Sequence, residues 1–409
     1  MEKRTIGLLL GDEEDWPTAF ELLAKRLGPA ITHKRRKYEI DVERIRIHPF
    51  PLNAPTRYNL VIDRLAYWHF NPREWLKKAA LLNGVYLLNN PFTFQSMEKH
   101  TAYCAMMRLG LNIPETWLIP PKHGPDTEKF RVTAAKYHDM FDLKEIAEQI
   151  GYPLYMKPFD GGGWRGVSRI DNEHDLFRSY DESLQSLMHL QAGIDNYDIF
   201  VRSLGIGPQI ISLRYDPSQP MHGRYVIDHG FLDEKRGREA VVITKLINAF
   251  FRWDFNSCEA LLQGDTLWPI DFANACPDVA VTSLHYYFPW AIKALMAWSI
   301  YCLVSDRPMS ITMDVDPYFK IADSERSYEE KLDAYEKLAD KHLDTEKFAD
   351  FRAKSLPHLD EAMWELVQSA EFDQMVVNTV RWTFPPHEQE QYIGHFRGLL
   401  RHWVDSDKP

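Results

Sequence analysis

Hydrophobic and polar positions over residues 1–95 form short blocks that predict strands separated by helices. Four apolar or alternating runs have the length of buried strands: 5–10, 38–47, 59–65 and 85–88. Helical spacing is predicted from Pro17 to a stop at Gly28, and again over 72–82. Strands that alternate with helices indicate a small open α/β domain in this part of the chain.

The middle of the chain has shorter strands arranged as hairpins. A helix is predicted over 96–109, and a second one, capped by Asp142, leads into a strand that ends at Lys157. Further elements are expected as follows: strands at 188–191, 199–206, 209–215, 258–262 and 266–272, and a helix at 239–255. We expect two subdomains here, 96–186 and 187–312.

In the last part of the chain, charged amphipathic helices replace strands. Helical spacing recurs over 328–341, 359–370 and 388–403. The sequence has no internal repeat or low-complexity tract. Residues 313–409 are therefore expected to form a helical extension that packs on the rest.

Composition indicates a soluble globular protein. Of the 409 residues, 45% are apolar and 26% are charged, and the formal net charge of −11 argues against nonspecific nucleic-acid binding. The four cysteines lie far apart, without zinc or disulfide spacing, which indicates a reducing cytoplasm. The apolar stretch 286–304 contains Pro289 and Lys293, so we expect a buried helix and not a membrane span.

The stretch from Tyr155 to Ile170 is the first candidate for chemistry. A short apolar strand ends in Lys157, a loop with four glycines follows, and Arg165 and Arg169 add positive charge. Glycines let backbone N–H groups turn toward an anion, and the cations could hold a polyphosphate. The spacing fits neither a Walker loop nor a dinucleotide fingerprint. A hairpin without a ligand explains these residues equally well, so both interpretations stay open.

The predicted hairpin after residue 258 carries polar groups among apolar ones. Glu259, Asp271 and Asn274 offer the hard oxygen ligands that Mg²⁺ prefers. A carboxylate on the buried face of a strand would be costly unless it were paired or metal-bound. Alternation sends half of a strand's side chains to solvent, and taken alone the three residues fit that simpler interpretation better.

Six segments of the chain follow one another in an order found in one enzyme superfamily. They are 85–91 with Met97-Glu98-Lys99-His100, then 109–116, 151–158, 161–167, 189–194 and 269–274. In this order they resemble the ATP-grasp superfamily of carboxylate–amine and carboxylate–thiol ligases, from residue 5 to about residue 305. The resemblance implies an α/β fold of the α+β ATP-grasp type, with a small N-terminal open α/β domain, a two-lobed ATP-grasp domain and a C-terminal helical appendage.

The resemblance also implies roles for the matching residues. ATP phosphates would be contacted by Lys99 and Lys157 and covered by Gly161, Gly162, Gly163, Arg165 and Gly166. Adenine and ribose would lie against Gln191 to Ile194 and against Asp195 or Asp198. The carboxylate substrate would face Arg202 and Arg214, and one or two Mg²⁺ ions would be held by Glu259, Asp271 and Asn274.

The sequence departs from the family pattern at the metal strand and at the hinge. Asp271 stands where the family has Glu, and two residues instead of one separate it from Asn274, so the role of Asn274 requires a bulge in the strand. The hinge has Gln191-Ala192-Gly193 where the family usually places an acidic or aromatic residue.

The activity that the resemblance implies is an ATP- and Mg-dependent ligase, which activates a carboxylate as an acyl phosphate and joins it to an amine. Small-molecule acids and amines of amino-acid or peptide-like type are the expected partners, without nucleic acid or membrane, and a homo-oligomer stays open. Two alternatives remain: a kinase on the same scaffold, and a regulatory protein that binds ATP without turnover.

Overall fold

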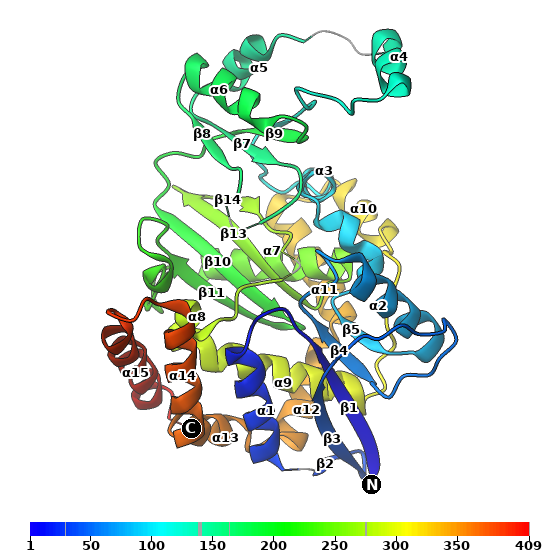
Figure 1. Ribbon diagram of the computed structural model, residues 1–409, viewed down its shortest axis with the longest axis vertical. Helices are drawn as coiled ribbons and strands as arrows, with labels where there is room; N and C mark the ends of the chain where they lie inside the picture. The colour runs from blue at the N-terminus through cyan, green and yellow to red at the C-terminus, as the bar shows by residue number, and fades with distance from the viewer. Residues whose placement is uncertain (29, 138–140, 163, 275, 409) are drawn as a thin grey trace. The chain divides into compact units, whose positions relative to one another are not determined.

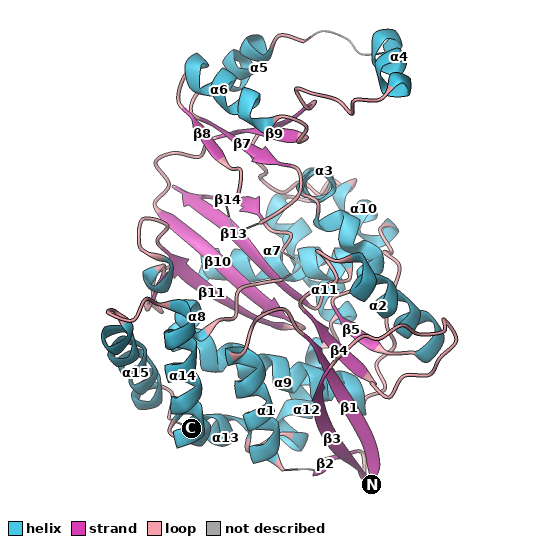
Figure 2. Cartoon of the chain, viewed as in Figure 1, coloured by secondary structure: helices cyan, strands magenta, loops and turns pink. Residues whose placement is uncertain are grey.

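The computed structural model describes residues 1–28, 30–137, 141–162, 164–274 and 276–408. The chain divides into two compact units. Unit 1 comprises Met1–Phe94, Arg202–Ser257 and Ala275–Pro409, and unit 2 comprises Gln95–Val201 and Cys258–Asn274. Mixed helices and strands confirm the expected α/β fold class (Figures 1 and 2). The four-part domain division expected from the sequence stays a prediction.

The N-terminal sheet of unit 1 has the order β2-β3-β1-β4-β5. Its strands are β1 (Glu2–Leu9), β2 (Ala30–His33), β3 (Arg36–Arg44), β4 (Leu60–Asp63) and β5 (Tyr86–Leu88), with helices α1 (Asp15–Leu27) and α2 (Phe70–Asn83). All neighbours pair in parallel except β2, which pairs antiparallel with β3 and was not predicted. The run at 59–65 forms a shorter strand than expected, because the Asp63 carboxylate accepts hydrogen bonds from the N–H groups of Leu65 and Ala66 and turns the chain.

A second five-stranded sheet has the order β12-β11-β10-β13-β14. It comprises β10 (Ile199–Ile206), β11 (Gln209–Tyr215), β12 (Tyr225–Val226), β13 (Phe255–Gln263) and β14 (Thr266–Asp271). Gly207 makes the turn between β10 and β11 with φ 55°, and a Cβ there would overlap the Trp298 ring. Helix α7 (Glu234–Phe251) begins earlier than the expected residue 239, because the Asp233 carboxylate caps it by accepting from the Arg236 N–H at 2.8 Å.

Unit 2 is built on an antiparallel sheet of order β6-β9-β7-β8. Its elements are η1 (Pro91–Met97, which starts in unit 1), α3 (Lys99–Arg108), β6 (Thr116–Ile119), α4 (Glu128–Tyr137), α5 (Leu143–Ile150), β7 (Leu154–Pro158), β8 (Ser168–Ile170), α6 (Glu173–Ser183) and β9 (Met188–Ala192). Helices α5 and α6 pack on this sheet through a core that includes Leu143, Met156 and Leu176 (Figure 1).

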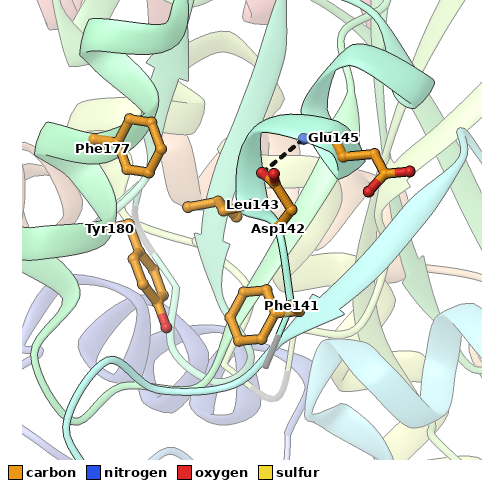
Figure 3. Close-up of a pocket in the computed structure, with 6 residues that line it drawn as sticks. All are labelled: Phe141, Asp142, Leu143, Glu145, Phe177 and Tyr180. Atoms are coloured by element: carbon orange, nitrogen blue, oxygen red, sulfur yellow. Dashed lines mark hydrogen bonds between the residues drawn. The ribbon is translucent and has the colours of Figure 1, made fainter. Parts of the chain in front are cut away.

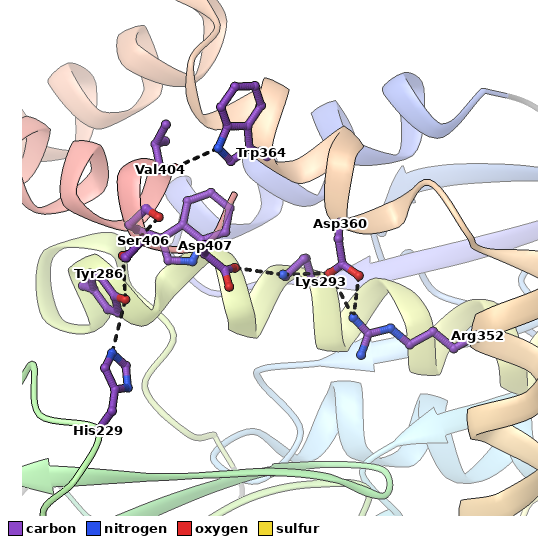
Figure 4. Close-up of polar contacts among 10 residues, drawn as sticks. His229, Tyr286, Lys293, Arg352, Asp360, Trp364, Val404, Ser406 and Asp407 are labelled. Carbon is purple, nitrogen blue, oxygen red and sulfur yellow. Dashed lines mark hydrogen bonds and ion pairs between the residues drawn. The ribbon is translucent and has the colours of Figure 1, made fainter. Parts of the chain in front are cut away.

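Helix α9 (Phe288–Val304) is almost entirely buried in unit 1. Among the described residues, the segment Val281–Val304 is long and apolar enough to span a membrane, and 94% of its most apolar window is buried inside the protein. Its burial agrees with the expected core helix. Lys293, on the α9 side that meets the C-terminal helices, pairs with Asp360 at 2.8 Å and Asp407 at 3.3 Å (Figure 4).

The C-terminal part of unit 1 is helical, as expected. They are α10 (Asp316–Ala322), α11 (Tyr328–His342), α12 (Thr345–Ser355), α13 (Leu359–Val367), α14 (Ala370–Thr383) and α15 (Gln389–Ser406). Ser369 separates α13 from α14, because its hydroxyl caps α14 by accepting from the Phe372 N–H. Further polar contacts, such as Trp364 Nε1 to the Val404 carbonyl at 2.9 Å, join these helices to one another (Figure 4).

Candidate functional site

Two buried lysines of unit 2 form the centre of the candidate site. Lys99 opens helix α3, and its side chain is 6% exposed. Its ammonium donates to the Gly161 carbonyl at 3.0 Å and lies 3.2 Å from the Asp271 carboxylate. The backbone N–H of Lys99 also donates to the Phe159 carbonyl at 2.8 Å, which fixes the start of the helix beside the glycine loop.

Lys157 is the penultimate residue of strand β7 and is 8% exposed. Its ammonium donates to the Gln191 side-chain carbonyl at 2.7 Å, and the Gln191 amide donates in turn to the Thr116 hydroxyl at 2.8 Å. The pKa of Lys157 is lowered to about 8, mainly by burial; Asp271 and Glu259 oppose this lowering, and Lys99 adds to it. Lys157 is thus a cation whose burial is only partly compensated.

A β-bulge aligns the two carboxylates of the hairpin. From the turn onward the register pairs Gln263 with Thr266 and Ala260 with Pro269, so regular pairing would place Glu259 opposite Ile270. The register shifts between Glu259 and Ala260, and Glu259 is instead opposite Asp271. Directly opposed residues share a face of the sheet, whereas without the bulge these two side chains would lie on opposite faces.

The carboxylates of Glu259 and Asp271 therefore lie on the same face of the hairpin, where both could bind one ligand. Asp271 is 34% exposed and paired with Lys99, so it is not a plain solvent-facing residue. Asn274 lies three residues beyond it, past the end of β14. Among the described residues no group of three His, Cys, Asp or Glu side chains could hold a metal ion. A metal here would have two carboxylates plus an amide or ligand oxygens, a donor set that suits Mg²⁺.

The glycine-rich loop has the backbone that its sequence requires. Gly161 and Gly166 have φ of 99° and 71°, which favour glycine, and a Cβ on Gly161 or Gly162 would meet open space. Gly163 lies outside the described residues. Arg165 is exposed and has no ion-pair partner in the part of the chain that the structure describes.

The hinge after β9 is held by polar contacts of its own. Gly193 donates to the Pro153 carbonyl at 2.9 Å, and a Cβ on it would come within 2.6 Å of the same oxygen. Asp195 binds the Arg169 guanidinium through both carboxylate oxygens, at 2.8 and 2.6 Å, which lowers the pKa of Asp195. Asp198 accepts from the Gly264 N–H at 2.8 Å. Ile194, which follows Gly193, is partly buried.

The two predicted substrate arginines belong to unit 1. Arg202 on β10 lies over the rings of Tyr215 and Tyr225, at 5.3 and 5.6 Å from their centroids. Arg214 on β11 pairs with Asp228 at 2.9 Å and is about half exposed. The structure thus brings together Lys99, Lys157, Glu259 and Asp271 in unit 2 and places the arginines on neighbouring strands of the second sheet.

Several side chains around the lysines were not anticipated from the sequence. Tyr103 on α3 donates to the Ile270 carbonyl at 2.7 Å, and burial raises its pKa well above the usual value. His189 is paired with Lys157 in the β7–β9 register and stacks on His100 with ring centroids 5.6 Å apart. Burial lowers the pKa of His189 to about 4, so it is neutral at physiological pH. No sequence signal pointed to His189, because its place beside Lys157 depends on the β7–β9 register.

A separate cavity of unit 2, of about 600 Å³, lies between α5 and α6 (Figure 3). Phe141, Leu143, Phe177 and Tyr180 supply its apolar lining. Asp142 is engaged as the cap of α5, accepting from the Glu145 N–H at 3.1 Å. None of the candidate site residues lines this cavity.

Comparison with known proteins gives fold-level likeness. No family model matches the chain. The 2-oxoglutarate carboxylase small subunit of Hydrogenobacter thermophilus is 42% identical over 45 residues, which span 11% of this chain and only 10% of that protein. D-alanyl-alanine synthetase A from Vibrio cholerae is 11% identical with a TM-score of 0.50, over 75% of this chain and 98% of that one. A RimK domain ATP-grasp protein from Sphaerobacter thermophilus is 13% identical with a TM-score of 0.47, over 75% and 100%.

At these identities the likeness concerns the fold. A parallel α/β sheet, an antiparallel sheet with a glycine-rich loop, and a further sheet that ends in a carboxylate-bearing hairpin follow one another along the chain. This is the order that the sequence segments led us to expect. The likeness therefore shows that the chain shares its overall fold with D-alanyl-alanine synthetase A.

Proposed function

We propose that this protein is an ATP- and Mg-dependent ligase that activates a carboxylate as an acyl phosphate and joins it to an amine. The observation that carries the proposal is the cluster in unit 2, where two buried lysines lie beside a pair of opposed carboxylates. A phosphoryl transfer needs cations on the phosphates and oxygen ligands for a metal ion, and both are present.

The residues fit a metal-bound nucleotide on their chemistry. Burying an ammonium is costly unless an anion compensates it, and the low pKa of Lys157 indicates that its own surroundings compensate it incompletely. Phosphate oxygens would supply the missing charge. Glu259 and Asp271, with Asn274 as a further oxygen donor, would hold Mg²⁺, which neutralises developing charge when bound.

The chain's own groups would act by positioning and by charge. The substrate carboxylate attacks the terminal phosphorus of ATP and ADP leaves; the amine then attacks the acyl carbon and phosphate leaves. No residue of the protein has to be the nucleophile. Arg202 and Arg214 are the proposed contacts of the carboxylate end, and Lys99 and Lys157 would hold the phosphates in line. Gln191 would orient Lys157 through its 2.7 Å hydrogen bond.

Lys157→Ala and Glu259→Ala test the proposal by substrate-dependent ADP release from a panel of carboxylates, with hydroxylamine as a generic acceptor. We expect each variant to lose at least a hundredfold in rate. Lys144→Ala is the matched control, since Lys144 is an exposed lysine of the same unit. Unchanged turnover in both site variants would overturn the assignment.

The same panel separates the proposal from its two rivals. An acyl phosphate gives a hydroxamate with hydroxylamine, whereas the stable phosphorylated product of a kinase does not. The two-residue spacing between Asp271 and Asn274 is the feature that favours a regulatory ATP-binding protein. That rival predicts ATP binding without ADP release for every acid and amine.

A further inference from the structure

Unit 1 contains a cavity that the proposed reaction does not use. Its volume is about 780 Å³, and it is lined by Arg44 at the end of β3, by the loop that follows β3 and by Trp75 of α2. The loop, residues 45–59, has no strand or helix and connects β3 to β4. It leaves the carboxyl end of β3, and in open α/β sheets ligands bind outside the carboxyl ends of the parallel strands.

The lining is basic in a protein that is acidic as a whole. Arg44, Arg46 and Arg57 line the cavity together with His48, and none of its lining residues is a carboxylate. Arg44 is paired with Glu14 and Glu21, at 2.5 and 2.8 Å. Among the described residues Arg46 and His48 have no hydrogen-bond or ion-pair partner. Arg57 is 68% exposed and pairs with Glu43, which is not a lining residue. Arg46 is thus a lining arginine without an ion-pair partner among the described residues, in a chain with a formal net charge of −11, and this favours an anionic ligand.

Aromatic rings form the rest of the wall. Tyr58 and Trp75 meet edge to face with centroids 6.1 Å apart, and the Arg57 guanidinium lies 5.3 Å from the Tyr58 centroid. Phe50 adds a third ring. Rings beside guanidinium groups favour a ligand that has a flat apolar body next to its charge.

A buried lysine holds the loop in place. Lys78 on α2 is 7% exposed, and its ammonium donates to the Ala54 carbonyl and to the Asn83 side-chain oxygen. Ala54 in turn donates its N–H to the Pro51 carbonyl at 2.9 Å. A long loop tied to a helix in this way presents a pocket that is formed before any ligand arrives.

We propose that this cavity binds a small anion, either carboxylate or phosphate, carried on a flat aromatic body. Arg46 and Arg57 bind the anionic group through charge-assisted hydrogen bonds, and Tyr58 and Phe50 cover the ring. The proposal stands apart from the ligase assignment, since every residue that carries it lies in unit 1 and none belongs to the nucleotide cluster.

The test uses the full chain and isothermal titration with two probes, 2-naphthoate and 1-naphthyl phosphate, and with neutral 2-naphthalenemethanol as the uncharged control. We expect one anion to bind at least tenfold more tightly than the alcohol. Arg46→Gln should weaken that binding about tenfold, and because Arg46 is exposed and unpaired the variant should keep its circular dichroism and its Tm. Arg381→Gln, an exposed arginine of α14, is the matched control.

The outcome also identifies the source of the ligand. Preference for naphthoate indicates a carboxylate ligand, and preference for the phosphate ester indicates a phosphorylated one. Failure of both anions to bind, or binding that Arg46→Gln leaves unchanged, overturns the proposal. Loss of ADP release in the Lys157→Ala variant with naphthoate binding retained would show that this cavity and the nucleotide cluster are separate sites.

Discussion

Binding of a nucleotide at the lysine cluster should be accompanied by proton uptake, because Lys157 is a lysine whose pKa is lowered into the range near neutral pH. Burial is the main cause that lowers this pKa to about 8. The Asp271 carboxylate, which opposes the lowering, also pairs with Lys99 at 3.2 Å, so its charge is shared between the two lysines. An arriving phosphate group adds negative charge beside the ammonium and raises the pKa of Lys157 back toward its ordinary value or above. The charged form then dominates in the complex.

The magnitude follows from the pKa of the free protein. A group with a pKa of about 8 is about half deprotonated at pH 8, so about 0.5 proton is taken up per nucleotide bound at that pH. Uptake falls to about 0.1 at pH 7 and rises to about 0.9 at pH 9. His189 does not contribute, since its pKa of about 4 keeps it neutral throughout this range.

Isothermal titration of Mg-ADP at pH 8 in Tris and in HEPES measures the uptake, because the observed enthalpy changes with the ionisation enthalpy of the buffer in proportion to the protons exchanged. Lys157→Arg is the control: guanidinium stays charged, so uptake should fall below about 0.1 while binding persists. Measurable binding with no buffer dependence at pH 8 in the wild type would refute the reasoning, and so would equal uptake in Lys157→Arg.

Three further predictions concern stability, each measured by urea unfolding. Lys293→Met removes the cation between two carboxylates and should cost about 1–3 kcal/mol, whereas Lys347→Met, in an exposed pair, should change stability by less than about 0.5 kcal/mol. Ser327→Ala removes the capping box of α11 and should cost about 1 kcal/mol; no change would argue against the cap. Burial lowers the pKa of His285 from 6.5 to about 4, so as the pH falls the unfolded chain binds a proton at this residue before the folded chain does. The free energy of unfolding should therefore fall by at most about 3 kcal/mol between pH 6.5 and pH 4. This loss should be smaller in His285→Phe.

Much of the fold could be predicted because its elements have local signals. Residues 5–9 of the predicted run 5–10 become the buried part of strand β1, and Asp142 caps α5 as its position suggested. Boundaries that depend on side-chain capping were harder to place: α7 starts at Glu234 because Asp233 caps it. Strand β2 (Ala30–His33) was missed because its four residues alternate weakly and gain their structure from pairing with β3.

In the candidate site, too, some features could be predicted from the sequence and others depend on how the strands pair. Lys157 ends an apolar strand and could be singled out from the sequence alone. The hydrogen bond from its ammonium to Gln191 could not, because which face of β9 meets β7 depends on sheet register. The opposition of Glu259 and Asp271 was equally hidden, since it depends on one extra residue in a strand, which no periodicity reports.

That bulge links the local geometry to the electrostatics of the whole cluster. With Glu259 and Asp271 on one face, their two negative charges balance in number those of Lys99 and Lys157, while the buried Lys157 ammonium itself stays only partly compensated. A nucleotide alone brings several negative charges and would upset this balance, whereas a nucleotide with bound Mg²⁺ brings fewer. The carboxylates that would repel the bare phosphates are also the ligands that the metal needs. In this arrangement metal and nucleotide should therefore bind cooperatively, each reducing the electrostatic cost of the other.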